Sequence, residues 1–186
     1  MPFLHDSPPK PRLNVQSGTI SMTVSPELKN IRPIILGAVI RGVSVDDEVI
    51  KRLMDHQEKL HFALGRGRKR ASIGVHDLKK ISPPFRVEAV ARDYKFIPLA
   101  KNEEMTISEI LENHPKGIEY ADLLQGMEKV PVILDSNDAV LSFPPIINGD
   151  HTTVTTSTAV THTVTSSDVN AVRVTLRFPS LQKFED

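Results

Sequence analysis

Residues 141–150 are of the types from which a small binding site can be built. The segment reads LSFPPIINGD, with two prolines that restrict the backbone and with Asn148, Gly149 and Asp150 at the end of an apolar stretch. A few polar groups that converge on an apolar surface can orient a small ligand. A loop stiffened by prolines has the same composition, so both interpretations stay open from these residues alone.

A second candidate is a run of four cations, Arg66, Arg68, Lys69 and Arg70, interrupted by Gly67. It follows a predicted helix and precedes a predicted strand, so we expect all four cations to lie on an exposed connection. RNA phosphates are the ligands such a loop would bind, and each contact would make the affinity salt-dependent. A solvated basic turn is the alternative interpretation.

His76 and Asp77 could form an acid–base pair, because a carboxylate can fix the tautomer of a histidine. Neighbouring side chains on a strand point to opposite faces, however, so we expect these two not to meet and to serve at the strand end instead. The seven histidines show no metal-binding spacing, and no metal is expected. Nucleotide-binding glycine motifs and the Gly-x-Ser-x-Gly elbow are missing from the sequence, which argues against a nucleotide-driven enzyme.

The length and composition predict one soluble domain, or at most two small ones. The 186 residues include 23 Lys plus Arg, 23 Asp plus Glu and no Cys, which excludes disulfides and cysteine-bound zinc. The sequence shows neither a long apolar run nor a signal pattern, so we expect a cytoplasmic protein without a membrane partner. The proline-rich residues 1–18 are interpreted as a flexible lead-in and residues 19–186 as a single domain.

The net charge of zero conceals a segregation of charge along the chain. Residues 59–80 contain seven cations and one acid, whereas residues 101–138 contain three cations and nine acids. A strongly basic balance is typical of nucleic-acid binders. The basic stretch therefore locates a possible phosphate-facing surface that the average charge hides.

Strands and helices are interspersed in the predicted order of elements. Residues 20–25 alternate between apolar and polar side chains, while residues 34–40 are apolar throughout, as expected for a central strand covered on both faces. A hairpin is predicted at 132–134 and 139–142, and alternation also indicates a closing strand at 171–178. Three further short strands are predicted at 71–75, 86–91 and 95–99.

Three helices are predicted between these strands. The first follows Ser44 or Asp46 as N-cap and ends at Gly65. The second begins with a capping box of Thr106 and Glu109 and ends before Pro115, and a short third helix spans 118–124. Because the order lacks the strict alternation of a parallel sheet, the fold class is predicted to be α+β.

Three separated segments carry a resemblance to a known family. They are HQEKLH at 56–61, RKRASIGVHDL at 68–78, and DSN at 135–137 followed by LSFPPIINGD at 141–150. In this order they resemble the amino-acid-editing domain of the archaeal and eukaryotic type of phenylalanyl-tRNA synthetase β subunit. The similarity runs over residues 31–156 and more faintly to 178.

The resemblance implies an α+β fold with mixed and antiparallel sheets in a sandwich-like arrangement, flanked by roughly three helices. It also implies hydrolysis of tyrosine wrongly attached to phenylalanine tRNA, by a positioned water and without a cofactor. The residues implied in catalysis are Asn148, Gly149, Asp150 and Thr165, those implied in substrate binding are Leu141, Ser142, Pro144 and Thr163, and those implied in RNA binding are Arg66, Arg68, Lys69 and Arg70.

The implied partners are the acceptor end of phenylalanine tRNA and, if the chain is a fragment, the rest of a β subunit and its α subunit. Near its end the chain departs from the family pattern, because Thr163 stands in place of an aspartate and Ser166 in place of a glycine. Two alternatives therefore stay open. One is a noncatalytic tRNA-binding or structural domain of the same fold, and the other is a small-molecule-binding domain unrelated to tRNA.

Overall fold

The structure, a computed structural model, describes residues 19–31, 34–40, 45–156 and 171–177. The predicted lead-in and the predicted site residues Thr163 and Thr165 lie outside this part of the chain.

A five-stranded sheet with the order β1-β4-β7-β8-β9 contains the predicted hairpin. Only β1 runs parallel to its neighbour, and the other pairs in this sheet are antiparallel. The hairpin prediction is confirmed, since β7 pairs with β8, which ends at Phe143 before the two prolines. The strands are β1 (Met22–Val24), β4 (Phe85–Ala91), β7 (Lys129–Leu134), β8 (Val140–Phe143) and β9 (Ile147–Asn148).

A second, three-stranded sheet is antiparallel and has the order β2-β10-β3. Its strands are β2 (Ile34–Ile40), β10 (Ala171–Arg177) and β3 (Ala71–Asp77), and a separate pair consists of β5 (Lys95–Phe96) and β6 (Met105–Thr106). The prediction that residues 34–40 form a central, fully covered strand is wrong. Among the described strands β2 lies at an edge, and its outward side chains Ile34 and Leu36 are 43% and 63% exposed. A continuous apolar run does not report which face lacks a covering layer.

The first two helices begin where the sequence indicates. Asp46 caps α1 by accepting a hydrogen bond from Val49 N at 2.7 Å, and Thr106 and Glu109 form the predicted capping box of α2. The third helix begins earlier than predicted, because Pro115 occupies its first turn, where a missing N–H costs nothing. No helix in the described part of the chain is both long and apolar enough to cross a membrane. The α-helices are α1 (Asp47–Phe62), α2 (Ile107–Asn113) and α3 (Pro115–Tyr120), and the 3-10 helices are η1 (Pro26–Asn30), η2 (Leu78–Lys80), η3 (Ala121–Leu124) and η4 (Asp150–Thr152).

The five-stranded sheet is buried on both faces because residues of β7 alternate between two core clusters. Val130, Val132 and Leu134 pack with Ile107 and other residues of the helical layer. Ile133 points the other way, into a cluster against which side chains of β2 also pack. The α+β class with a sandwich-like arrangement is therefore confirmed.

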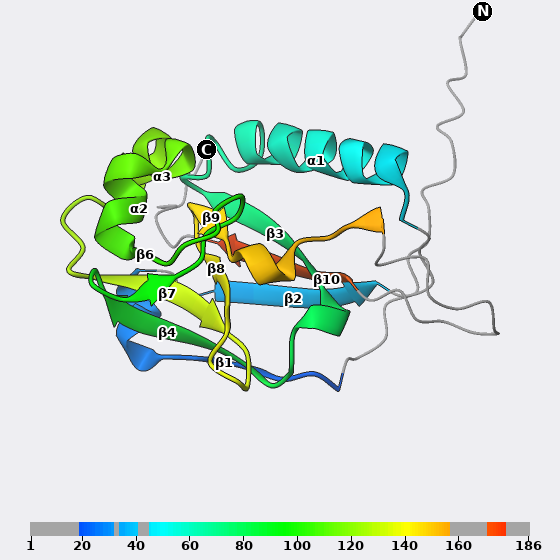
Figure 1. Cartoon of the computed structure of the whole chain (residues 1–186). Helices are drawn as coiled ribbons and strands as arrows, with labels where there is room; N and C mark the ends of the chain where they lie inside the picture. The colour runs from blue at the N-terminus through cyan, green and yellow to red at the C-terminus, as the bar shows by residue number, and fades with distance from the viewer. Residues whose placement is uncertain (1–18, 32–33, 41–44, 157–170, 178–186) are drawn as a thin grey trace, which may run out of the picture.

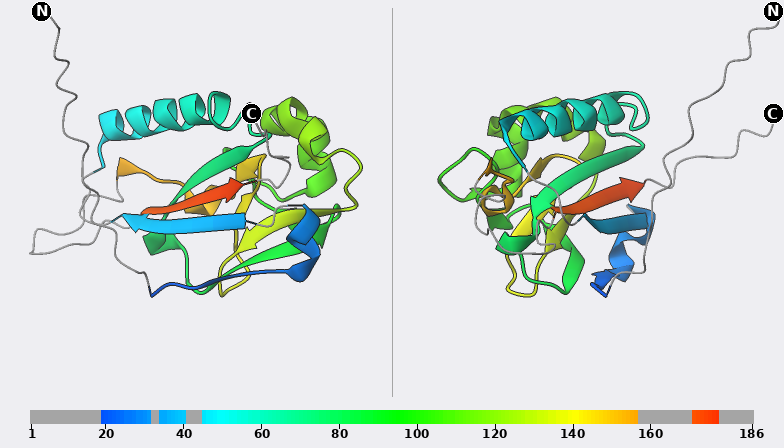
Figure 2. Two further views of the ribbon diagram at one scale, coloured as in Figure 1. Left: turned by 180° about the vertical axis from the view of Figure 1, so that it is seen from behind. Right: turned by 90° about the vertical axis from the view of Figure 1, so that its right-hand side faces the viewer.

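Helix α1 lies along the three-stranded sheet, on the side away from β1 and β4, as Figure 1 and the rear view in Figure 2 both show. Helices α2 and α3 lie beyond the end of α1, beside β6. This arrangement brings the last turns of α1, strand β3 and the β8–β9 hairpin to one place, where the candidate site lies.

Candidate functional site

A cavity of about 210 Å³ lies where the two sheets meet beneath α1. A buried water needs roughly 10–15 Å³ of such volume, so this space is large enough for a side chain together with water. Most of its wall is apolar, with polar groups at a few points. The lining residues are Met54, Gln57, Glu58, His61, Arg68, Ser72, Ile73, Gly74, His76, Leu99, Lys116, Ile133, Ser142, Pro144, Pro145, Ile146, Ile147 and Asn148.

The β8–β9 pairing positions two polar side chains of the predicted site. Ser142 is the ladder partner of Asn148, and its Oγ donates to Asn148 Oδ1 at 2.9 Å. The backbone of Asn148 is held in turn, because its carbonyl accepts from Leu99 N at 2.9 Å. Both side chains line the cavity, as does Pro144. The structure therefore brings Ser142, Pro144 and Asn148 together.

One face of α1 and one face of β3 form the opposite wall. Met54, Gln57, Glu58 and His61 recur at the spacing of a single helix face. Ser72, Gly74 and His76 alternate along β3 and so share one side of that strand. The wall is thus built from two regular elements, which hold side chains more rigidly than loops do.

Arg68 is not the exposed cation that the sequence predicts. Its side chain is buried, and its Nη1 donates to the carbonyls of Pro145 and Ile146 at 3.0 and 2.9 Å. Nη2 forms an ion pair with Glu58 at 3.0 Å, and the guanidinium carbon lies 4.2 Å from the ring centroid of Tyr120. The free carbonyls of the proline segment draw this cation inward, and Arg68 therefore fixes the cavity wall.

Of the other three cations in the basic loop, two are exposed as predicted and one is not. Arg66 and Lys69 are exposed, while Arg70 is half-buried. The loop turns sharply, with positive φ at Arg66, Gly67 and Arg68. Phe62, just before this loop, is 83% exposed. The loop therefore presents two cations and an aromatic ring to solvent.

His61 joins α1 to β3 through its ring. Nε2 accepts a hydrogen bond from Ile73 N at 2.8 Å, so the neutral ring carries its proton on Nδ1. Nδ1 lies 3.5 Å from the Glu58 carboxylate, beyond an ordinary N–H···O hydrogen bond. Burial, and then the charge of Arg68, lower the pKa of His61, although Glu58 opposes them.

His76 is fully buried in the same wall. Its Nδ1 lies 2.9 Å from Thr152 Oγ1, while Asp77 caps the next turn through Lys79 N, so the expected separation of these two side chains is confirmed. Burial lowers the pKa of His76 to about 4, and His151 contributes in the same direction. The imidazole is therefore neutral at physiological pH.

Buried polar atoms without a hydrogen-bond partner are concentrated at this cavity. Five such atoms occur in the described part of the chain, and four of them belong to residues that line the cavity. Native proteins leave few buried polar atoms unpaired, so a cluster of them indicates a site at which a polar ligand or water can bind. The four atoms are Gln57 Oε1, His61 Nδ1, Arg68 Nε and His76 Nε2.

Other predicted site residues lie away from the cavity wall. Leu141 is fully buried in a core cluster. Gly149 packs so closely on β8 that a Cβ there would lie 2.1 Å from the carbonyl oxygen of Val140. Asp150 accepts from Ala100 N at 3.1 Å and so fixes a neighbouring loop. These three residues position the site rather than line it.

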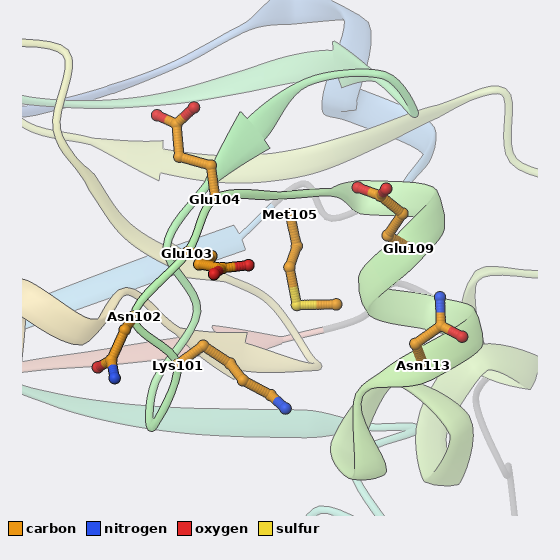
Figure 3. A pocket seen from close by; sticks show the side chains of 7 residues that line it. All are labelled: Lys101, Asn102, Glu103, Glu104, Met105, Glu109 and Asn113. Carbon is orange, nitrogen blue, oxygen red and sulfur yellow. The ribbon is translucent and has the colours of Figure 1, made fainter.

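A larger hollow, of about 430 Å³, lies elsewhere, between the loop 101–104 and α2. Figure 3 shows Glu103 and Glu104 on the loop, with Glu109 and Asn113 on the helix. Its carboxylates would repel RNA phosphates, so we assign the candidate site to the smaller cavity. No cluster of three metal-ligating side chains occurs among the residues that the structure describes.

Sequence reasoning left most of the α1 and β3 wall unassigned. Gln57, Glu58, His61 and Gly74 lie within the segments that carry the family resemblance, but no motif marks them as site residues, and His76 is considered only as an acid–base partner of Asp77. The usable signal was periodicity. A helix face that retains Gln57, Glu58 and His61 opposite a strand face with Ser72, Gly74 and His76 is more polar than a core requires.

The fold and this cavity define an α+β domain with a candidate site at the junction of two packed sheets. The B3/4 domain model matches residues 30–178. The phenylalanine–tRNA ligase β subunit of Methanosarcina barkeri is 52% identical over 147 residues, which cover 79% of this chain and 27% of that protein. That of Methanocorpusculum labreanum is 47% identical over 168 residues, covering 90% and 31%.

A solved structure agrees with these relatives. The N-terminal fragment of the phenylalanyl-tRNA synthetase β subunit from Pyrococcus horikoshii has a TM-score of 0.81 and 35% identity, covering 90% of this chain and 46% of that one. The chain belongs to the B3/4 domain family, in the form found in phenylalanyl-tRNA synthetase β subunits. The resemblance read from the sequence is therefore confirmed, and the chain spans less than a third of the length of the two ligase subunits above.

Proposed function

We propose that this domain hydrolyses the ester of tyrosine wrongly attached to phenylalanine tRNA. The observation that carries the proposal is the set of unpartnered buried polar atoms on the wall of an otherwise mostly apolar cavity. Such a cavity can accept an aromatic ring and can also form a hydrogen bond with a polar group on that ring. The relatives are β subunits of phenylalanine–tRNA ligase, and tyrosine differs from phenylalanine only by a hydroxyl group.

A second site is needed for a physical reason. A synthetic pocket for phenylalanine cannot perfectly exclude the larger tyrosine, which only adds a hydroxyl group. A site that hydrogen-bonds the hydroxyl group rejects phenylalanine strongly, because its own polar groups would otherwise stay unpaired. An editing cavity with unpaired polar atoms meets this requirement.

The reaction needs a positioned water and a held ester. Water adds to the ester carbonyl, the bond from that carbon to the ribose oxygen breaks, and the ribose oxygen leaves with a proton as a hydroxyl group. Asn148 lines the cavity with its Oδ1 engaged by Ser142, so its Nδ2 can donate to the ester carbonyl or to the water. No cofactor is needed for this step.

The tRNA would approach over the end of α1. Arg66 and Lys69 are exposed there, and aromatic side chains beside cations are typical of sites for single-stranded nucleic acid, which makes Phe62 a stacking platform for an acceptor-end base. The carboxylates at 101–104 and on α2 disfavour the other approach. We propose that the domain acts in the cytoplasm within a synthetase, with the tRNA and an α subunit as partners.

A deacylation assay tests the proposal. The 186-residue chain is incubated with tyrosyl-tRNA and phenylalanyl-tRNA for phenylalanine, and amino acid release is followed against the uncatalysed rate. We expect rapid release of tyrosine and slow release of phenylalanine. If neither is released above background, the hydrolytic role is wrong.

The same assay decides the second candidate function. Thr163 and Ser166 replace an aspartate and a glycine of the family pattern, which favours a domain that binds tRNA without hydrolysing the ester. Intact tRNA binding together with no release of tyrosine would establish that function instead.

A further inference from the structure

The hydrogen bonds of Thr152 fix the tautomer of His76. Thr152 Oγ1 lies 2.9 Å from the carbonyl oxygen of Gly149 and 2.9 Å from His76 Nδ1. A carbonyl oxygen can only accept, so the single hydroxyl proton of Thr152 goes to Gly149. The second contact must then be donated by the ring, and His76 carries its proton on Nδ1.

Nε2 of His76 is therefore left with a lone pair and nothing to accept. The atom is buried and has no hydrogen-bond partner among the described residues. A buried acceptor without a donor costs about 1–3 kcal/mol. Protonation does not relieve this cost near neutral pH, since burial lowers the pKa of the ring to about 4. The site is poised to take one hydrogen-bond donor.

The space in front of this acceptor exists because residue 74 is glycine. A Cβ at Gly74 would lie 2.9 Å from His76 Nε2 and 3.2 Å from Asn148 Oδ1. Asn148 Oδ1 already accepts from Ser142, so His76 is the unsatisfied member of the pair. The lining of the same cavity also includes the apolar residues Ile73, Ile133 and Ile147.

We propose that Nε2 of His76 is the acceptor that binds the phenolic hydroxyl group of tyrosine and so sets the specificity of the cavity. This inference rests on the proposed function for its substrate. A phenol presents one O–H donor at the end of a flat apolar ring, which matches an unpaired acceptor on the wall of a mostly apolar cavity. Phenylalanine would fill the same space and leave Nε2 unpaired.

His76 is less suited to act as a general base than as a hydrogen-bond acceptor. Its low pKa makes it a weak base near neutral pH, and efficient proton transfer favours a group whose pKa lies near the operating pH. A neutral acceptor with a fixed tautomer is suited to recognition, because it discriminates between a donor and a C–H group without changing charge.

Two substitutions separate the two nitrogens of the ring. His76→Asn can keep a donor at the position of Nδ1 for Thr152 and removes Nε2, whereas His76→Gln places an amide near the position of Nε2. His151→Asn is the control, since His151 is an exposed neighbour that does not line the cavity. The readouts are the deacylation rates of tyrosyl-tRNA and phenylalanyl-tRNA.

For His76→Asn we expect tyrosyl-tRNA deacylation to fall by roughly 10- to 100-fold, the effect of losing one buried hydrogen bond to the substrate. Deacylation of phenylalanyl-tRNA should be unchanged or rise. His76→Gln should retain part of the selectivity, and His151→Asn all of it. Equal losses for both substrates in His76→Asn would overturn the proposal, because His76 would then serve hydrolysis or folding.

A binding measurement on the unaltered chain covers the case in which the variants do not fold. The probes are 3′-deoxyadenosine carrying tyrosine or phenylalanine through a non-hydrolysable 3′-amide, and the signal is the ¹⁵N resonance of His76 Nε2. A shift with the tyrosyl probe only supports the proposal. Tyrosyl-probe binding without a shift, or the same shift with both probes, overturns it.

Ester hydrolysis by the domain and tyrosine recognition by His76 can be contradicted separately. If the tyrosyl probe shifts Nε2 while no ester is hydrolysed, the hydrolytic function is wrong and the recognition site stands. If tyrosyl-tRNA is hydrolysed selectively and His76→Asn keeps that selectivity, the function stands and His76 is not the acceptor.

Discussion

The polar side chains of the cavity are held in single orientations by groups behind them. Ser142 fixes Asn148, and Thr152 fixes His76, in each case through a hydrogen bond of 2.9 Å. This second layer leaves one face of each side chain for the ligand. A site held in this way loses little entropy when it binds.

Replacing Asn148 by Ala tests this division of roles. We expect deacylation of tyrosyl-tRNA to fall roughly 100-fold, as for other losses of a preorganised polar group that contacts the reacting atoms. The free energy of unfolding should fall by only about 1 kcal/mol, the typical value for one hydrogen bond. Chemical denaturation and the deacylation rate measure the two effects.

Asn113→Ala is the matched control for this change, because Asn113 is exposed on α2 and lies outside the cavity. Its rate and stability should match those of the unaltered chain. A loss of several kcal/mol in Asn148→Ala would show that this residue holds the β8–β9 hairpin together rather than serving the reaction.

The buried imidazole of His76 should make folding sensitive to acid. Its pKa is about 4 in the folded chain and 6.5 for the free residue, so the unfolded chain binds the extra proton first as the pH falls. Stability from this group is complete above pH 6.5 and is lost between pH 6.5 and 4, by about 3 kcal/mol in total.

Urea unfolding at pH 7 and pH 5 checks this prediction. His61, His114 and His151 also have lowered pKa values, so the unaltered chain and His76→Asn should both lose stability at pH 5. We expect the unaltered chain to lose about 2 kcal/mol more. Equal losses would mean that His76 titrates alike in the folded and unfolded states.

At the scale of elements, the loop after α1 combines a buried structural cation with exposed cations, and the sequence does not distinguish the two kinds. Residues 66–70 are read as one exposed basic loop, and four of the five are cations. In the structure Arg68 turns inward to the carbonyls of Pro145 and Ile146, seventy-seven and seventy-eight residues away along the chain. Composition cannot identify such a partner, because only the tertiary fold brings the free carbonyls near this loop.

Two double variants with the same change in charge test the outer part of the loop. Arg66→Ala with Lys69→Ala should weaken tRNA binding and reduce the slope of log affinity against log salt by about 1–2, at roughly 0.7–0.9 per lost phosphate contact. Lys101→Ala with Lys129→Ala, in the acidic stretch, should leave the slope unchanged. Filter binding over a range of salt concentrations measures the slope for each double variant. If the two double variants have equal slopes, the loop does not contact the tRNA.

Arg68→Ala is expected to differ in kind from these variants. It removes a buried cation and leaves Glu58 and two carbonyl groups without their partner, so we expect a loss of about 2–4 kcal/mol in the free energy of unfolding. Arg66→Ala should cost less than about 0.5 kcal/mol. Similar stabilities for the two single variants would contradict the buried position of Arg68.

For the whole molecule, local sequence signals predict where the helices and strands begin and end better than they predict which strands pair with one another. Asp46, the Thr106–Glu109 capping box and the prolines after Phe143 fixed element ends correctly, because caps and prolines act on the adjacent backbone. The order β2-β10-β3 joins strands more than ninety residues apart, and no local pattern predicts it. The same holds for the cavity, whose walls come from both sheets and α1. The family resemblance predicts the sandwich-like arrangement of the sheets, which the periodicity of the sequence does not predict.

The placement of β2 gives a test of this tertiary arrangement. Ile35 packs against the core cluster between the two sheets, whereas Leu36 points outward and is 63% exposed. We expect Ile35→Thr to lower the free energy of unfolding by about 1–2 kcal/mol and Leu36→Thr by less than about 0.5 kcal/mol. Thr suits a strand, so the pair isolates burial from strand propensity. If both variants lose equally in urea unfolding, the outward face of β2 is covered, as its continuous apolar sequence predicts.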